Sequence, residues 1–307
     1  MSSLVIPTKE LKSLRDWVRW SASSFNAAGL FYGHGTDNAF DDALELVLAS
    51  LHLDHSLPES YLDARVSIQE AEILADRVRR RIEQRVPVAY LTGRAYFAGL
   101  EFIVDENVLV PRSPLAELII EQFQPWLGNL EVNHILDLCT GSGCIGIACA
   151  YAFAEASVDL ADISPEALEI ARRNIEKHQL DERVQARHSD VFDGLKGEKY
   201  ELIVSNPPYV SISEMKGLPE EYGHEPSLGL VAGEDGMDIV SRMLCEAPAH
   251  LSANGIIVIE VGASADQLMA RYPSVPFLWL DFEHGGDGVF MLTVEQLNDY
   301  HAIFLEG

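Results

Sequence analysis

The sequence has few cysteines, no long apolar run and a shortage of positive charge. Its 307 residues include 4 cysteines, and 22 Lys and Arg stand against 48 Asp and Glu, for a formal net charge of −26. No stretch approaches the roughly 18 apolar residues of a membrane-spanning helix. The first residues also lack the basic region and apolar block of a secretory signal. We therefore expect a cytoplasmic protein with no membrane partner.

Three of the cysteines, Cys139, Cys144 and Cys149, lie five residues apart in one apolar segment. Structural zinc sites use closer pairs of ligands, so this spacing does not indicate one. Small buried thiols in a reducing compartment explain the pattern better. We predict no metal site.

The negative charge is concentrated in the C-terminal two thirds of the chain. Residues 1–94 hold 11 basic and 13 acidic side chains, whereas residues 95–307 hold 11 and 35. A surface of this sign repels phosphates, so direct DNA binding is not expected. It would attract a basic partner, although solubility alone explains the charge equally well.

Hydrophobic spacing divides the chain into three parts. Helical periodicity predicts helices within residues 11–25, 40–53 and 67–86, which form a helical domain at residues 1–93. Asn38 and Ser67 are suitable N-caps for two of them. We interpret the five arginines between positions 77 and 85 as a solvated face. An alternating segment then predicts a β-hairpin linker at residues 94–111, with its turn at 105–107.

From residue 134 onward, short apolar strands alternate with helical segments. This order predicts a doubly wound, mostly parallel α/β sheet in a domain spanning residues 112–307. The last two predicted strands, 276–283 and 288–294, read as a hairpin, so one strand should be antiparallel. Residues 210–234 show no periodicity, and structureless loops of this length are usually functional.

The first predicted strand runs into the sequence DLCTGSG, from Asp137 to Gly143. Gly141 and Gly143 allow a tight turn and the close approach of a ligand. The spacing fits neither the dinucleotide fingerprint G-x-G-x-x-G nor a phosphate-binding P-loop. A plain turn between strand and helix is the alternative. At the carboxyl end of a parallel sheet, such a loop favours a nucleotide-like ligand.

Acidic residues end the next two predicted strands. Asp162 can accept both hydroxyls of a ribose, or it can cap the helix that begins at Ser164. Asp190 can accept from an adenine amino group, with Val191 or Phe192 covering the ring. Capping alone does not explain acids at three successive strand ends, so a nucleoside-binding edge is the better hypothesis.

The fourth strand ends in Asn206-Pro207-Pro208-Tyr209. The prolines hold the chain extended, so the carbonyl of Pro207 has no helix to bond to. That carbonyl and the Asn206 amide oxygen form a pair of acceptors suited to a planar NH₂ group, on which Tyr209 can stack. A proline-rich turn whose Asn caps locally is the alternative.

Together these motifs resemble the class I S-adenosylmethionine-dependent methyltransferases that modify planar nitrogens. That group includes adenine-amino nucleic acid methyltransferases and protein glutamine methyltransferases. The resemblance implies a seven-stranded sheet, S-adenosylmethionine as cofactor and a catalytic motif at Asn206, Pro207, Pro208 and Tyr209. The cofactor-binding residues that it implies are Asp137, Cys139, Thr140, Gly141, Ser142, Gly143, Asp162, Ile163, Asp190, Val191, Phe192 and Asn206.

Residues 87–114 resemble the interdomain region of the glutamine methyltransferases, which carry a small helical domain in front of the catalytic one. The N-terminal sequence and the segment HEPSLGL are closest to the branch that methylates ribosomal protein L-three of the large subunit. The release-factor branch usually reads Pro-Arg-Pro-Glu-Thr-Glu after the hairpin, and the acid of that motif is replaced here by Leu115. The implied partner is this basic ribosomal protein, free or in a large-subunit precursor.

The proposed chemistry follows from the amide group. A carboxamide nitrogen is a poor nucleophile because its lone pair is delocalised into the carbonyl. Two rigid acceptors that bind both N–H hydrogens would return electron density to the nitrogen, much as an oxyanion hole stabilises a transition state with donors. Three alternatives remain at this stage: a release-factor methyltransferase, an adenine-amino nucleic acid methyltransferase, and a ribosome-assembly factor without catalysis.

Overall fold

A computed structural model describes residues 4–283 and 285–306. Contacts divide the chain into two compact units, each described by itself below. The first unit comprises Met1–Ala95, Val104–Glu106 and Pro219–His224, and the second comprises Tyr96–Ile103, Asn107–Leu218 and Glu225–Gly307. The short segment 219–224 therefore leaves the C-terminal part of the chain and folds with the helices.

The first unit is a helical bundle. Its elements are α1 (Leu14–Ala27), α2 (Ala39–Ser50), the short 3₁₀ helix η1 (Glu59–Asp63), α3 (Ile68–Glu83) and α4 (Val88–Thr92). The predicted caps are confirmed: Asn38 accepts from two backbone N–H groups at the start of α2, and Ser67 forms a capping box with Glu70. Trp17 and Phe25, both fully buried, belong to the core between the helices.

The predicted solvated face of α3 is wrong for Arg81, whose side chain is only 2% exposed. Its Nε donates to Asp42 Oδ2 at 2.8 Å, its Nη1 to Glu221 Oε1 at 3.3 Å and its Nη2 to the carbonyl oxygen of Phe31 at 2.8 Å. A buried guanidinium needs such partners because its desolvation is otherwise unfavourable. Glu221 belongs to the segment 219–224, so this ion pair holds that segment in the helical unit.

The linker forms a two-stranded sheet from β1 (Arg94–Phe97) and β2 (Leu100–Ile103). The turn predicted at residues 105–107 is wrong, because Ala98 and Gly99 connect the strands. Both have positive φ, 48° and 77°. Two such residues make a short turn that matches the twist of the flanking strands, a conformation that an alanine rarely adopts and that the sequence therefore does not signal.

The second unit contains a seven-stranded sheet in the order β5-β4-β3-β6-β7-β9-β8. The strands are β3 (His134–Leu138), β4 (Ser157–Asp162), β5 (Val184–His188), β6 (Tyr200–Ser205), β7 (Leu251–Glu260), β8 (Leu278–Trp279) and β9 (Val289–Thr293). Neighbouring strands from β5 to β7 pair in parallel, whereas β9 is antiparallel to both β7 and β8. The predicted doubly wound, mostly parallel sheet is confirmed.

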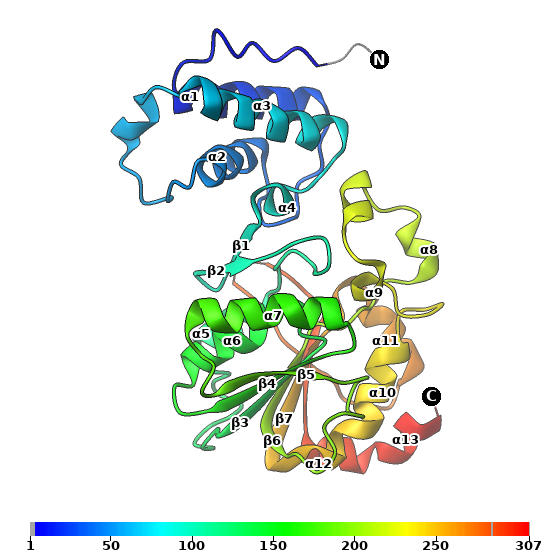
Figure 1. Cartoon of the computed structure of the whole chain (residues 1–307). Coiled ribbons are helices and arrows are strands. Elements are labelled where there is room, and N and C mark those ends of the chain that lie inside the picture. The colour runs from blue at the N-terminus through cyan, green and yellow to red at the C-terminus, as the bar shows by residue number, and fades with distance from the viewer. Residues whose placement is uncertain (1–3, 284, 307) are drawn as a thin grey trace. The chain divides into compact units, whose positions relative to one another are not determined.

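Helices cover both faces of this sheet (Figure 1). Successive strand residues point to opposite faces, so Ile135 packs in one core and Leu136 in the other. The first core holds side chains of α5 (Leu115–Ile120), α6 (Cys144–Ala152) and α7 (Pro165–His178). The second holds those of α10 (Asp238–Glu246), α11 (Ala265–Arg271), α12 (Val294–Asp299) and α13 (His301–Glu306). With both faces buried, the strands are continuously apolar.

Two regions differ from the predicted elements. The chain was expected to close on a strand, but α12 and α13 follow β9; the side chain of Thr293 caps α12. The long aperiodic loop is also structured, since α8 (Ile212–Met215), the 3₁₀ helix η2 (Glu220–His224) and α9 (Ser227–Leu230) interrupt it. These helices are too short to produce a recognisable hydrophobic period. In the described part of the chain, no helix has both the length and the apolarity to cross a membrane.

Candidate active site at the carboxyl ends of the strands

The parallel sheet brings the predicted site residues to one edge. Strands β4, β3 and β6 are neighbours in the order β4-β3-β6, and parallel strands end at the same side of a sheet. Asp162 lies at the end of β4, and Asn206 directly follows β6. The loop Cys139–Gly143 directly follows β3 between them. The nucleoside-binding sequence and the NPPY sequence, far apart in the chain, are therefore adjacent in space.

The loop after β3 is held by carboxylates. Asp137 Oδ2 accepts from the Thr140 hydroxyl and, at 2.8 Å, from the Gly146 N–H at the start of α6. Asp162 Oδ2 accepts from the Gly141 N–H at 2.9 Å. These bonds join the loop to the next strand end. The Asn174 side chain donates to the Ser142 carbonyl at 2.8 Å and completes the support from α7.

The backbone of this edge adopts unusual conformations. Cys139, Gly141 and Gly143 all have positive φ, 56°, 55° and 83°, and Val191 after β5 has φ 51°. Positive φ is a strained conformation for a β-branched residue, and such residues are concentrated at functional sites. The strain at Cys139 and Val191 marks both ends of the predicted cofactor edge.

Several features fit a nucleoside cofactor at this edge. A methyl group added at Gly141 would meet no atom within 4 Å, so the loop borders open space. Asp137 Oδ1 is buried without a hydrogen-bond partner among the described residues, and burial raises the pKa of this carboxyl to about 7. Ile163 is 43% exposed beside Asp162 and offers an apolar surface to a planar ring.

Asp162 does not itself cap α7, since the N-cap is Ser164, whose hydroxyl accepts from the Ala167 N–H. Oδ1 of Asp162 accepts from the Ser164 N–H at 2.9 Å. Burial raises the pKa of Asp162, whereas hydrogen bonds from the backbone of Ser164 and Gly141 lower it. Each carboxylate oxygen keeps a further lone pair for an outside donor. The bonds that Asp162 accepts therefore leave room for the predicted ribose contact.

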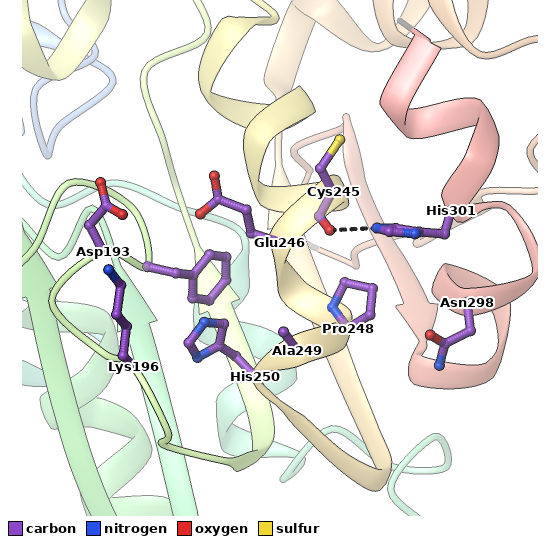
Figure 2. A pocket seen from close by; sticks show the side chains of 10 residues that line it. Asp193, Lys196, Cys245, Glu246, Pro248, Ala249, His250, Asn298 and His301 are labelled. Carbon is purple, nitrogen blue, oxygen red and sulfur yellow. Dashed lines mark hydrogen bonds between the residues drawn. The ribbon is translucent and has the colours of Figure 1, made fainter.

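Asp190, Val191 and Phe192 follow β5 but differ in surroundings. Asp190 Oδ1 accepts from Arg242 Nη1 of α10 at 2.6 Å. The Phe192 ring is 2% exposed and stacks on His250, with centroids 4.5 Å apart. Both rings border a cavity of about 420 Å³, drawn in Figure 2. The cavity is lined also by residues of α10, α12 and α13, and of the predicted site residues only Phe192 reaches it.

The NPPY sequence is held between the sheet and the structured loop. Pro207 is buried, while Asn206, Pro208 and Tyr209 are partly exposed. Val210 donates to the Leu230 carbonyl at 2.8 Å and accepts from the Ala232 N–H at 3.1 Å. These bonds anchor the far end of the motif and close the loop that carries α8 and α9.

The Tyr209 ring lies against the backbone of Gly262, two residues beyond the end of β7. Gly262 has φ 48°, and a Cβ there would approach the Tyr209 ring to 2.9 Å. The Ser264 hydroxyl donates to the Tyr209 carbonyl at 2.8 Å. Only glycine allows this approach, so residue 262 helps to set the position of the tyrosine.

Glu260, at the end of β7, is a site residue that the sequence analysis missed. It is 6% exposed, and it accepts from the Ser113 hydroxyl at 2.5 Å and from the Tyr209 hydroxyl at 3.3 Å. Asn206 follows Ser205, the residue opposite Ile259 on the neighbouring strand β6, so its side chain lies beside Glu260. Burial raises the pKa of Glu260 to about 7, against the lowering effect of these hydrogen bonds and of Arg112. An acid that ends an apolar strand, in the sequence IIVIE, was the available signal.

Arg112 and Glu225 form a two-pronged ion pair. Both terminal guanidinium nitrogens of Arg112 donate to the Glu225 carboxylate at 2.6 Å, and the Glu225 side chain is fully buried. The Val110 N–H donates to the same carboxylate at 3.1 Å. Bidentate pairs of this kind are strong and directional. This pair joins the segment before α5 to the segment HEPSLGL, two stretches on which the family resemblance rests.

Comparisons with known proteins agree with this geometry. Residues 116–218 match the family model described as "Methyltransferase small domain". The chain is similar to the ribosomal protein uL3 glutamine methyltransferase of Francisella tularensis, with 45% identity over 295 residues, covering 96% of this chain and 94% of the relative. It is also similar to the protein of that name from Bordetella pertussis, with 46% identity over 291 residues, covering 94% of this chain and 98% of the relative.

Proposed function

Because the chain belongs to the family of protein glutamine methyltransferases, we propose that it methylates the side-chain amide nitrogen of a glutamine in ribosomal protein uL3. The family predicted from the motifs is confirmed by the two relatives. The substrate proposal rests on how much of the chain aligns with the two relatives. The alignments span about 95% of the chain and so include the helical unit as well as the sheet.

The proposed cofactor site is the edge formed by β3, β4 and β5. Asp162 would accept from the ribose hydroxyls, and the loop Cys139–Gly143 would lie along the cofactor with its backbone. Because the Phe192 ring packs on His250 in the core, we assign the adenine contacts to Asp190, Val191 and the exposed Ile163. When bound, S-adenosylmethionine supplies an electrophilic methyl group.

The proposed catalytic residues act on the glutamine amide. Asn206 Oδ1 and the Pro207 carbonyl would accept its two N–H hydrogens, which shifts density towards nitrogen and away from amide resonance. Pro208 keeps the chain extended so that the two acceptors stay fixed. Tyr209, held by Gly262 and Ser264, would cover the face of the amide. The amide proton is released to water once nitrogen carries the new methyl group.

The division of charge is consistent with the proposed substrate. The acidic sheet domain suits a basic ribosomal protein, and we assign target recognition to the helical domain predicted at residues 1–93. A release-factor substrate is less well supported, because the relatives carry the uL3 name and the chain has Leu115 where that branch has an acid. An adenine substrate is disfavoured by the net charge of −26.

The test is transfer of a labelled methyl group from S-adenosylmethionine into a lysate from cells that lack this gene, followed by mass spectrometry of the labelled peptide. We expect label on one glutamine of uL3, with isolated uL3 and large-subunit precursors compared as substrates. Asn206→Ala is the matched inactive control: losing one fixed acceptor should lower kcat roughly 10²- to 10³-fold, with cofactor affinity within twofold. Label on a release factor or on nucleic acid would refute the proposal.

A further inference from the structure

The amide of Asn206 presents an orientation problem. A carboxamide carries an acceptor oxygen on one side and a donor NH₂ group on the other. The proposed reaction requires the oxygen to face the substrate, since an NH₂ group there would oppose the N–H hydrogens of the glutamine. Nothing in the NPPY sequence itself decides between the two orientations.

Glu260 is placed to favour one orientation of the Asn206 amide. Strands β6 and β7 are parallel neighbours with Ser205 opposite Ile259, so Asn206 and Glu260 each follow as the next residue of their strand. This register places the Asn206 side chain beside the Glu260 carboxylate, and Asn206 is among the groups that lower the pKa of Glu260. A carboxylate only accepts, so Nδ2 is the end of the Asn206 amide that Glu260 favours as its neighbour. Oδ1 would then face away from Glu260.

We propose that Glu260 is a positioning residue that fixes the Asn206 carboxamide with its oxygen towards the substrate, and that it aligns Tyr209 through the same carboxylate. This inference rests on the function proposed above. Tyr209 donates to Oε1 at 3.3 Å and Ser113 to Oε2 at 2.5 Å. One buried group therefore organises both side chains of the catalytic motif, much as outer-shell partners orient the residues that touch a substrate.

The orientation of the Asn206 amide depends on the protonation state of Glu260. When ionised, Glu260 accepts from Ser113 and Tyr209 and attracts the NH₂ end of the Asn206 amide. When protonated, it gains a donor that can bond to Asn206 Oδ1 and so favour the flipped amide. Burial raises its pKa to about 7, so activity should fall as pH drops through 7. The charged or titratable neighbours are Tyr209 and Arg112, while β9 places only Val289 opposite.

The decisive variants are Glu260→Gln, which removes the charge and keeps the shape, and Ser113→Ala, which removes one bond that favours ionisation. We expect Glu260→Gln to lower kcat at pH 8 at least about tenfold, the lower end of outer-shell effects, and to abolish the acid limb of the pH profile. Ser113→Ala should move that limb to higher pH. KM for uL3 and cofactor affinity should change less than twofold. Glu201→Gln, at the opposite end of β6, serves as the control and should keep wild-type kcat.

A mutant cycle separates positioning from general damage. If Glu260 acts through Asn206 and Tyr209, adding Glu260→Gln to an enzyme that already carries Asn206→Ala and Tyr209→Phe should lower the residual rate by less than about twofold. A tenfold further loss would overturn the proposal, as would a Glu260→Gln enzyme with unchanged kcat and an unchanged pH profile. Thermal unfolding of each variant verifies that the chain folds.

A measurement without substrate keeps this inference separate from the function proposed above. In protein labelled with ¹⁵N-asparagine, the side-chain NH₂ resonance that disappears in Asn206→Ala should titrate near pH 7 in wild type and not in Glu260→Gln. Titration of that signal with no label in uL3 would refute the substrate and support the orientation by Glu260. A resonance that ignores pH would refute Glu260 even if uL3 is methylated.

Discussion

Replacing Arg81 by alanine should unfold the helical unit at much lower denaturant than wild type. The change removes a guanidinium that is 2% exposed, and it leaves the carboxylates of Asp42 and Glu221, 5% and 3% exposed, without their buried cation. It also removes the donor to the Phe31 carbonyl. The loss is therefore not one of contact alone, because the buried Asp42 carboxylate loses its cation and Glu221 keeps only the more distant Arg85, at 3.7 Å.

Breaking a buried ion pair by removing one partner typically costs about 3 to 5 kcal/mol. Since domains are stable by only about 5 to 15 kcal/mol in total, a loss of this size is a large share of the unit's stability. Each 1.4 kcal/mol corresponds to about a tenfold change in an equilibrium constant. The population of the opened helical unit should therefore rise by at least about 100-fold.

Hydrogen–deuterium exchange of the full chain, measured by mass spectrometry, reports the population of the opened helical unit separately from that of the sheet unit. Peptides covering α1 and α2 should exchange at least about 100-fold faster in Arg81→Ala, while peptides from β3 and β6 keep wild-type rates. Arg79→Ala is the matched control, with the same residue type on the same helix but an exposed side chain; it should change stability by less than about 0.5 kcal/mol. Equal exchange in the two variants would refute the reasoning.

Three further predictions concern the sheet unit. Asp162→Ala should weaken S-adenosylmethionine binding at least about tenfold, since it removes the ribose acceptor and releases the Gly141 N–H; an unchanged dissociation constant by calorimetry would contradict the assignment. Gly262→Ala should lower kcat more than cofactor affinity, because its Cβ would lie 2.9 Å from the Tyr209 ring; equal kinetics to wild type would exclude a role for that contact. Without ligand, the urea concentration at the unfolding midpoint should decrease as pH rises from 4 to 7, because the folded-state pKa values of Asp137 and Glu260 are both raised to about 7. Below pH 4 both carboxyls are protonated in the folded and the unfolded chain, and the stabilising protons are lost from the folded chain as pH rises through 7. Glu260→Gln should make this slope shallower, and a midpoint that rises over the same range would refute the assignment.

Local sequence patterns were sufficient to predict the layered fold and the sheet edge at which the candidate site lies. A run of apolar residues ending in DLCTGSG or NPPY constrains backbone conformation over only a few residues, and such constraints are readable directly from residue type. Parallel strands then place all their carboxyl ends together, so the location of Asp162 and Asn206 followed once the alternation of strands and helices was recognised.

The partners of buried charges depended on tertiary structure. Arg81 meets Glu221 across 140 residues of sequence, and Ser113 meets Glu260 across 147. No periodicity encodes such pairs, because they arise from the order of strands in the sheet and from the path of the loop after NPPY. The sequence predicted Asn206 as an acceptor. In our proposal Glu260 sets which end of its amide faces the substrate, and only the folded sheet brings these two strand ends side by side.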